Sequence, residues 1–153
     1  MNQKNFFELN FKSLKNFLIK DLEIEEKKVS MRCKQLWQAV YKKGSFKINN
    51  LTTFPLELRS KLNDLISLQR PKIINTQTSS DGTIKWLVKL FDGNEVECVY
   101  IPEKTRATLC ISSQVGCTLN CRFCHTGTQR LVKNLSFAEI VNQVIIAKEQ
   151  IND

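Results

Sequence analysis

The sequence of 153 residues has few of the features that mark a membrane or secreted protein. No stretch approaches the roughly 18 apolar residues that a membrane-spanning helix requires. The N-terminus lacks an apolar signal segment. Six cysteines are present, but three of them fall within eight residues, which is not the spacing of a disulfide framework. We therefore expect a cytoplasmic protein in a reducing compartment, with no membrane contact.

Acidic residues are too few to balance the basic residues in the first part of the chain. Residues 1–70 hold 14 Lys and Arg against 7 Asp and Glu, whereas residues 71–153 hold 9 against 8. The basic excess of the first part favours a polyanionic partner such as RNA. The alternative is a set of solvated lysine-rich helix faces.

Three short helices are predicted in the first 70 residues. Apolar residues recur at helical spacing over residues 7–18 and again over 29–40, with Gly44 as a stop signal. A third helix begins at Pro55 and runs through Ile66. We expect a small bundle in which aromatic residues such as Trp37 pack in the core and do not form a base-stacking platform.

The pattern then changes from helical to extended. A strand starts at Ile73, and Asp81-Gly82 is a turn signal before a second strand over residues 84–91. Asp92-Gly93 is another turn signal, and a third strand follows over residues 96–101. Two Asp-Gly turns between such runs predict an antiparallel meander.

A further strand is predicted over residues 106–113, followed by a loop and a helix. Ser136 and Glu139 have the spacing of a capping box, and Leu135 and Ile140 that of a hydrophobic staple. The order fits the first β/α unit of a barrel, a fold whose chemistry lies at the carboxyl ends of its strands. The residues predicted to face inward on the helix are Ile140, Val144, Ile145 and Ala147.

The residues best suited to chemistry are Cys117, Cys121 and Cys124, which form a CxxxCxxC motif. Thiolates suit both zinc and iron–sulfur clusters. A structural zinc site requires four ligands, and His125 or Cys110 would have to complete it here. Three cysteines without a fourth close behind instead favour a cluster with one iron open to a small molecule.

The wider sequence resembles the radical S-adenosylmethionine (SAM) enzymes, and among them the RlmN-type adenine-C2 RNA methyltransferases. The resemblance rests on SSDGTIKW at residues 79–86, VYIPE at 99–103 and RATLCISSQVGCTLNCRFC at 106–124. It covers residues 70–150 closely and residues 1–70 more loosely. Three matching blocks in order are far more specific than a cysteine motif alone.

The resemblance implies cofactors and residue roles. Cys117, Cys121 and Cys124 would hold a [4Fe-4S] cluster that binds SAM at its open iron, and an external electron donor would reduce it. The protein would position and tune this radical chemistry. Glu97 matches the family's proposed proton acceptor, and Cys110 a cysteine that acts on the covalent adduct between enzyme and RNA. Without the resemblance, the sequence predicts that Glu97 is a solvated carboxylate and that Cys110 is a buried strand cysteine.

The chain also departs from the family's pattern. The family's methyl-carrying cysteine and most of its SAM pocket lie in the C-terminal part, and none of the six cysteines matches that role. Cys33 and Cys98 are expected to be buried core thiols. After Cys124 only 29 residues remain, and a whole α/β barrel takes roughly 250. We expect the front part of a longer enzyme, whether a truncated gene product, a split-gene piece or a fragment.

The predicted fold class is α/β. Residues 1–70 form a helical accessory domain that docks RNA, and residues 71–153 form antiparallel strands that lead into the first β/α unit of an incomplete radical SAM barrel. The implied activity is methylation of adenosine C2 in 23S rRNA and tRNA by a monomer. The alternatives are a non-catalytic RNA-binding remnant and a small zinc-binding module.

Overall fold

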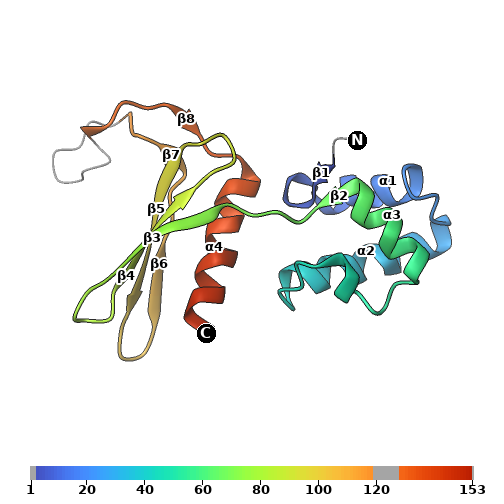
Figure 1. Cartoon of the computed structure of the whole chain (residues 1–153), viewed down its shortest axis with the longest axis horizontal. Coiled ribbons are helices and arrows are strands. Elements are labelled where there is room, and N and C mark those ends of the chain that lie inside the picture. Colours follow the sequence, from blue (N-terminus) through green and yellow to red (C-terminus); the bar gives the residue numbers. More distant parts are fainter. Residues whose placement is uncertain (1–2, 119–127, 153) are drawn as a thin grey trace. The chain divides into compact units, whose positions relative to one another are not determined.

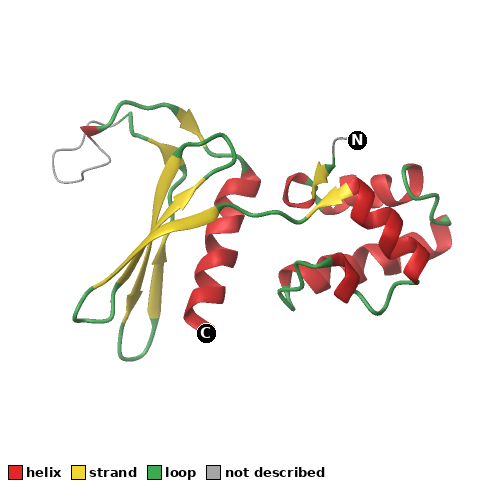
Figure 2. Ribbon diagram, in the orientation of Figure 1, coloured by secondary structure: helices red, strands yellow, loops and turns green. Residues whose placement is uncertain are grey.

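The computed structural model describes residues 3–118 and 128–152, and it divides into two compact units (Figure 1). The first unit spans Met1–Gln69 and is mainly helical. The second spans Arg70–Asp153 and combines an antiparallel sheet with one long helix (Figure 2). Each unit has a core of its own, and none of the helices in the described residues is both long and apolar enough to cross a membrane.

The helical unit packs α1 against α2, with α3 lying beside η2. A short parallel pairing of β1 with β2 joins the beginning of the unit to its end, since Lys4 is opposite Ile66. Its elements are β1 (Lys4–Asn5), the 3₁₀ helix η1 (Phe6–Glu8), α1 (Phe11–Lys20), α2 (Glu26–Tyr41), the 3₁₀ helix η2 (Ile48–Asn50), α3 (Leu56–Leu65) and β2 (Ile66–Ser67).

The predicted helices are present, but two of their ends were wrong. Phe7 lies in η1, and α1 begins only at Phe11 because the Asn10 side chain caps it, accepting a hydrogen bond from Ser13 N at 2.8 Å. The third helix ends at Leu65, one residue early. Ile66 has extended backbone angles and pairs with β1, a conformation that suits a β-branched side chain.

The core of the helical unit is apolar, and the prediction for its aromatic residues is confirmed. Trp37 is half-buried and its ring contacts those of Phe6, Phe11 and Tyr41. Cys33 is fully buried, also as predicted. The largest side chains buried in this unit are Phe6, Phe7, Leu14, Leu18, Leu36, Phe54 and Leu62.

The second unit contains the predicted meander, a four-stranded antiparallel sheet in the order β3-β4-β5-β6. Both Asp-Gly turns are present, with Gly82 and Gly93 at positive φ, and each aspartate accepts a hydrogen bond from the backbone two residues on. The elements are β3 (Lys72–Thr78), β4 (Ile84–Lys89), β5 (Glu95–Pro102), β6 (Ala107–Cys110), β7 (Gln114–Val115), β8 (Lys133–Asn134) and α4 (Phe137–Asn152).

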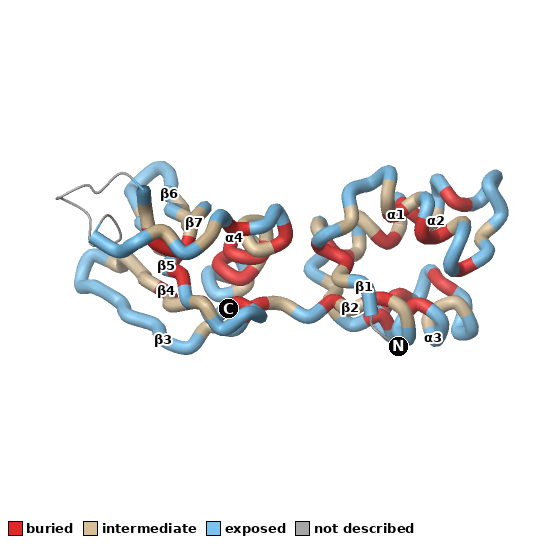
Figure 3. The backbone as a smooth tube through the Cα atoms, turned by 90° about the horizontal axis from the view of Figure 1, so that it is seen from above, coloured by how far each residue is buried: buried red, intermediate tan, exposed pale blue. Residues whose placement is uncertain are grey.

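Helix α4 lies along one face of this sheet (Figure 1). Trp86 and Val88 of β4 and Cys98 of β5 point toward it and are buried, and the strand segments that carry them are among the buried ones in Figure 3. The residues between them alternate onto the opposite face, where the side chains are exposed or half-buried. The sheet therefore has one covered face and one open face.

The start of α4 agrees with the sequence, and its buried side agrees in part, since Ala147 is buried and Ile140 packs against the core. Ser136 and Glu139 form the capping box, with Ser136 N donating to Glu139 Oε2 at 2.8 Å. Val144, predicted to face inward, is 44% exposed, whereas Ile146 is buried. The buried side is shifted because the polar residue Gln143 occupies a core position.

The predicted strand over residues 106–113 is shorter in the structure. Strand β6 covers Ala107–Cys110, and the chain re-forms a strand only at β7. In the sheet β6 pairs with the antiparallel β5. The expectation that β6 is the first strand of a parallel barrel therefore remains a prediction.

Candidate functional site

The cysteine motif begins at a short paired stem, which we call the neck and which consists of residues 113–117 and 129–135. Strands β7 and β8 pair antiparallel within it. Three backbone hydrogen bonds reinforce the pairing, from Leu135 N to Ser113 O, from Val132 N to Val115 O and from Cys117 N to Gln129 O, at 2.8 to 3.1 Å. The neck brings together the two ends of the segment that carries the motif.

Gly116 allows the two sides of the neck to approach. Its φ is +76°, a conformation that L side chains rarely adopt. A Cβ atom at this position would lie 2.1 Å from the carbonyl oxygen of Arg130 on the opposite side. The neck therefore requires glycine immediately before the first cysteine of the motif.

Of the three predicted cluster ligands, the structure places one. Cys117 is half-buried at the end of the neck, and its backbone forms an isolated β-bridge with that of Arg130. Cys121, Cys124 and the neighbouring His125 lie outside the described residues. Within the described ranges no three metal-ligating side chains converge, and two of the predicted ligands are not in those ranges.

Lys133 connects the neck to the rest of the unit through ion pairs. Lys133 of β8 forms ion pairs with Asp92, in the turn between β4 and β5, and with Glu139 of α4, the latter at 2.7 Å. Hydrogen bonds from Lys133 and from Asn94 lower the pKa of Asp92 to about 2. Sheet, neck and helix thus meet at one cation, whose side chain is 29% exposed.

A buried amide holds the chain between β6 and the neck. Gln143 is fully buried in α4, and its Oε1 accepts a hydrogen bond from Ser112 N at 2.8 Å while its Nε2 donates to Ser112 O at 2.9 Å. The side chain thereby satisfies both backbone groups of one residue. Ser112 Oγ in turn donates to the carbonyl oxygen of Glu97 at 2.8 Å.

Glu97 and Cys110, the two predicted catalytic residues, lie on the open face of the sheet. Cys110 is opposite Val99 in the register, and Glu97 is two residues before Val99, so all three project from the same face. Such diagonal neighbours are about 7–8 Å apart. Glu97 also forms an ion pair with Lys85 at 3.0 Å.

The interpretation of Cys110 as a buried strand thiol is wrong, since its side chain is exposed. Cys98, on the other face, is 1% exposed as predicted. Burial, with a smaller contribution from Cys110, raises the pKa of Cys98 to about 11. Cys98 therefore stays a neutral thiol at neutral pH, and the sheet separates one accessible thiol from one inert thiol.

Sequence reasoning missed the three residues that position this site, Gly116, Lys133 and Gln143. The signal for Gln143 was present, because a glutamine interrupts the apolar side of an otherwise well-patterned helix. Gly116 directly precedes the CxxxCxxC motif, and a close backbone approach is a common reason for glycine. Lys133 had no such signal, since its two carboxylate partners are distant or on another element.

Comparisons with known proteins give one consistent result. The chain is 51% identical over 129 residues to the dual-specificity RNA methyltransferase RlmN of Rhodopseudomonas palustris (strain BisB5), and 48% identical over 139 residues to that of Bradyrhizobium sp. (strain ORS 278). The chain resembles part of an RlmN-type methyltransferase. These matches cover 80% and 87% of the chain but only 32% and 34% of the relatives, so it spans about a third of their length.

A solved structure gives a match to the wider class of radical SAM methyltransferases. A radical SAM methyltransferase from Sphaerobacter thermophilus superposes with a TM-score of 0.83 over 97% of this chain and 42% of its own, at 29% identity. No family model matches the chain. The α/β fold expected from the sequence is thus similar to that of part of a radical SAM methyltransferase.

Proposed function

We propose that this chain supplies the RNA-docking unit and the cluster-binding loop of a radical SAM methyltransferase that modifies C2 of adenosine in 23S rRNA and tRNA. The observation that carries the proposal is the neck, which starts the CxxxCxxC segment on a rigid stem at Cys117. The identity of about one half to RlmN proteins supports it.

Cys117, Cys121 and Cys124 would hold a [4Fe-4S] cluster, and SAM would bind at its open iron. Cysteine thiolates are the ligands of iron–sulfur clusters, usually four, and a set of three would leave one iron open. The neck fits this role because Gly116 and the Cys117–Gln129 hydrogen bond fix where the first thiol leaves the stem. When bound, this pair of cofactors supplies the radical chemistry.

Glu97 and Cys110 would serve the reaction from the open face of the sheet. Both side chains are exposed, so an RNA base can reach them without unpacking the core. Glu97 would accept the proton lost from the adenine carbon, and the hydrogen bond from Lys85 Nζ at 3.0 Å would orient its carboxylate. Cys110 would act as the thiol that releases the methylated base from the protein.

The helical unit would hold the RNA. It carries most of the chain's positive charge, and neutralising phosphates releases bound counterions and so drives association. The expected setting is the cytoplasm, with an external electron donor, and the enzyme would act as a monomer. Lysines and arginines of the second unit are balanced by nearly as many carboxylates, which suits an active site better than a docking surface.

The test is anaerobic reconstitution of the 153-residue chain with iron and sulfide, followed by iron and sulfide analysis and visible absorbance. The wild-type chain should take up a cluster with a broad visible band, and Cys117→Ala, Cys121→Ala and Cys124→Ala should each abolish it. Cys33→Ala is the control, since that thiol is buried in the other unit. Equal loss in all four variants would contradict the assignment, and stoichiometric zinc without a visible band would support the zinc module.

A further inference from the structure

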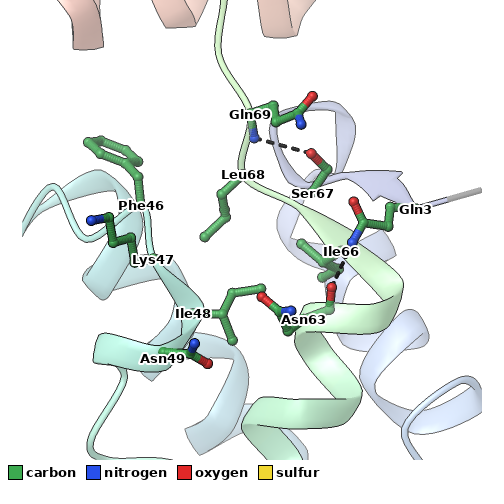
Figure 4. A pocket seen from close by; sticks show the side chains of 10 residues that line it. All are labelled: Gln3, Phe46, Lys47, Ile48, Asn49, Asn63, Ile66, Ser67, Leu68 and Gln69. Atoms are coloured by element: carbon green, nitrogen blue, oxygen red, sulfur yellow. Dashed lines mark hydrogen bonds between the residues drawn. The ribbon is translucent and has the colours of Figure 1, made fainter.

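The helical unit contains an open pocket of about 340 Å³ between η2, the end of α3 and β2 (Figure 4). Its floor is apolar, formed by Ile48, Ile66 and Leu68, each at most 8% exposed. Around the floor stand the side chains of Asn49, Asn63 and Gln69. The volume lies at the lower end of the range for small-ligand pockets, about 300–1,000 Å³.

The amide groups at this pocket are available to a ligand. The side chains of Asn49, Asn63 and Gln69 are exposed, and they make no hydrogen bond to other residues in the described part of the chain. Each carries a donor and an acceptor at fixed spacing. The edges of nucleobases present the same pairing of donor and acceptor, and Asn or Gln commonly binds an adenine edge in this bidentate way.

The surroundings favour an anionic polymer over a neutral metabolite. Lys47 lines the pocket, and Lys42 and Lys43 precede it in the chain. No Asp or Glu is among the described residues that line it. Phe46 also lines the pocket (Figure 4), and its ring packs against that of Phe7, with the centroids 6.4 Å apart. The apolar floor suits the flat face of a base, which stacks with little regard to sequence.

We propose that this pocket binds an unpaired base of RNA, by preference adenine. The base must be unpaired because a base that is paired and stacked within an RNA duplex cannot enter a pocket, and its major-groove edge lies in a groove that side chains cannot read. This proposal rests on the RNA-docking role proposed above, which it makes more specific. Phosphates of the flanking nucleotides would lie toward Lys47.

The test uses the full 153-residue chain and two RNA hairpins that differ only in one bulged adenosine. Fluorescence anisotropy should show the bulged hairpin binding about tenfold more tightly, which is the size expected from one bidentate amide contact to a base edge. In the Asn49→Ala/Asn63→Ala double variant this preference should disappear, while the affinity for the unbulged hairpin stays the same.

A matched control separates the pocket from the general surface. Asn16 and Asn50 are also exposed asparagines of this unit but do not line the pocket, so Asn16→Ala/Asn50→Ala should retain the preference. Circular dichroism checks the fold; alanine at position 63, within α3, favours the helix.

Each outcome decides the question. Equal affinity of the wild-type chain for both hairpins overturns the pocket proposal and leaves RNA docking intact. A preference that survives in the pocket variant shows that the bulge is recognised elsewhere and also overturns it. No binding to either hairpin overturns the docking role itself, and the pocket proposal with it.

Discussion

The two units fill their interiors in different ways. In the helical unit every buried residue that the structure describes is apolar or a cysteine, whereas α4 of the second unit buries the amides Asn142 and Gln143. Apolar burial is non-directional and tolerates small shifts. A buried hydrogen bond fixes position, because an unsatisfied partner is costly. The second unit thus uses directional contacts where the cysteine loop has to be placed.

The units also differ in charge. Residues 1–69 hold 13 Lys and Arg against 7 Asp and Glu, and residues 70–153 hold 10 against 8. If the first unit docks RNA, its lysines should dominate the dependence of binding on salt. We therefore predict that removing the same number of lysines changes the salt dependence of RNA binding more in the first unit than in the second.

The largest expected effect comes from neutralising Lys12, Lys34, Lys42 and Lys43 to Gln in the helical unit. All four are exposed. Affinity for a structured RNA should fall steeply, and the slope of log K against log salt should decrease by up to about 0.9 for each lysine that contacts a phosphate. Filter binding at several salt concentrations measures this slope.

The matched control for that experiment removes the same charge from the second unit. Lys72, Lys89, Lys104 and Lys148 are likewise exposed, and their change to Gln should alter the slope much less. Equal slopes for the two quadruple variants would remove the distinction between a docking unit and a catalytic unit.

The second prediction concerns the neck and compares two glycines. Gly116→Ala should destabilise the neck by about 3 kcal/mol or more, because a positive φ costs about 1–2 kcal/mol and the new Cβ meets backbone. Hydrogen exchange at Val132 N, which bonds to Val115 O, reports neck opening. Iron uptake should fall with it.

Gly93→Ala is the control for this change. Gly93 also has a positive φ of 88°, but no atom lies within 4 Å of the position its Cβ would take. Gly93→Ala should destabilise the protein by about 1 kcal/mol and leave hydrogen exchange at Val132 N unchanged. Similar effects of the two substitutions would show that close approach at the neck does not matter.

The third prediction removes the directional contact in the core. Gln143→Leu should destabilise the second unit by about 2–3 kcal/mol, since both backbone groups of Ser112 lose their partner. Faster exchange of the Ser112 amide is the specific measurement. Gln150→Leu on the exposed side of the same helix should change stability by less than about 0.5 kcal/mol. If the Gln143→Leu variant is as stable as the wild-type chain, the buried amide is dispensable.

The difference between apolar burial in the first unit and hydrogen-bonded burial in the second explains which features the sequence could predict. In the helical unit apolar periodicity alone places the helices, because the buried side is the apolar side. In α4 that rule selects Val144 and misses Gln143, since the buried side there is defined partly by a hydrogen bond to a residue 31 positions away. The Asp-Gly turns and the capping box are local and were predicted correctly. The neck depends on contacts across the loop, which no local pattern contains.

The smallest expected effect concerns pH and the ion pairs of Lys133. Asp92 has a folded pKa of about 2, below its ordinary value of 3.8. Its ion pair therefore stabilises the second unit above about pH 4, and this contribution is lost as the pH falls through about 2. Because the Asp92 side chain is 39% exposed, the contribution should be less than about 1 kcal/mol and should decrease with salt.

Asp92→Asn tests this prediction in a Trp37→Phe background, where the buried Trp86 is the remaining tryptophan and reports on the second unit. Urea unfolding followed by fluorescence should give a lower midpoint for the variant at pH 7. The difference should shrink toward zero near pH 2, because the wild-type carboxyl is then protonated and no longer attracts Lys133. A difference that stays constant across this range would mean that Asp92 acts through its turn, where it accepts a hydrogen bond from Asn94 N at 3.0 Å, and that its charge does not fasten the neck.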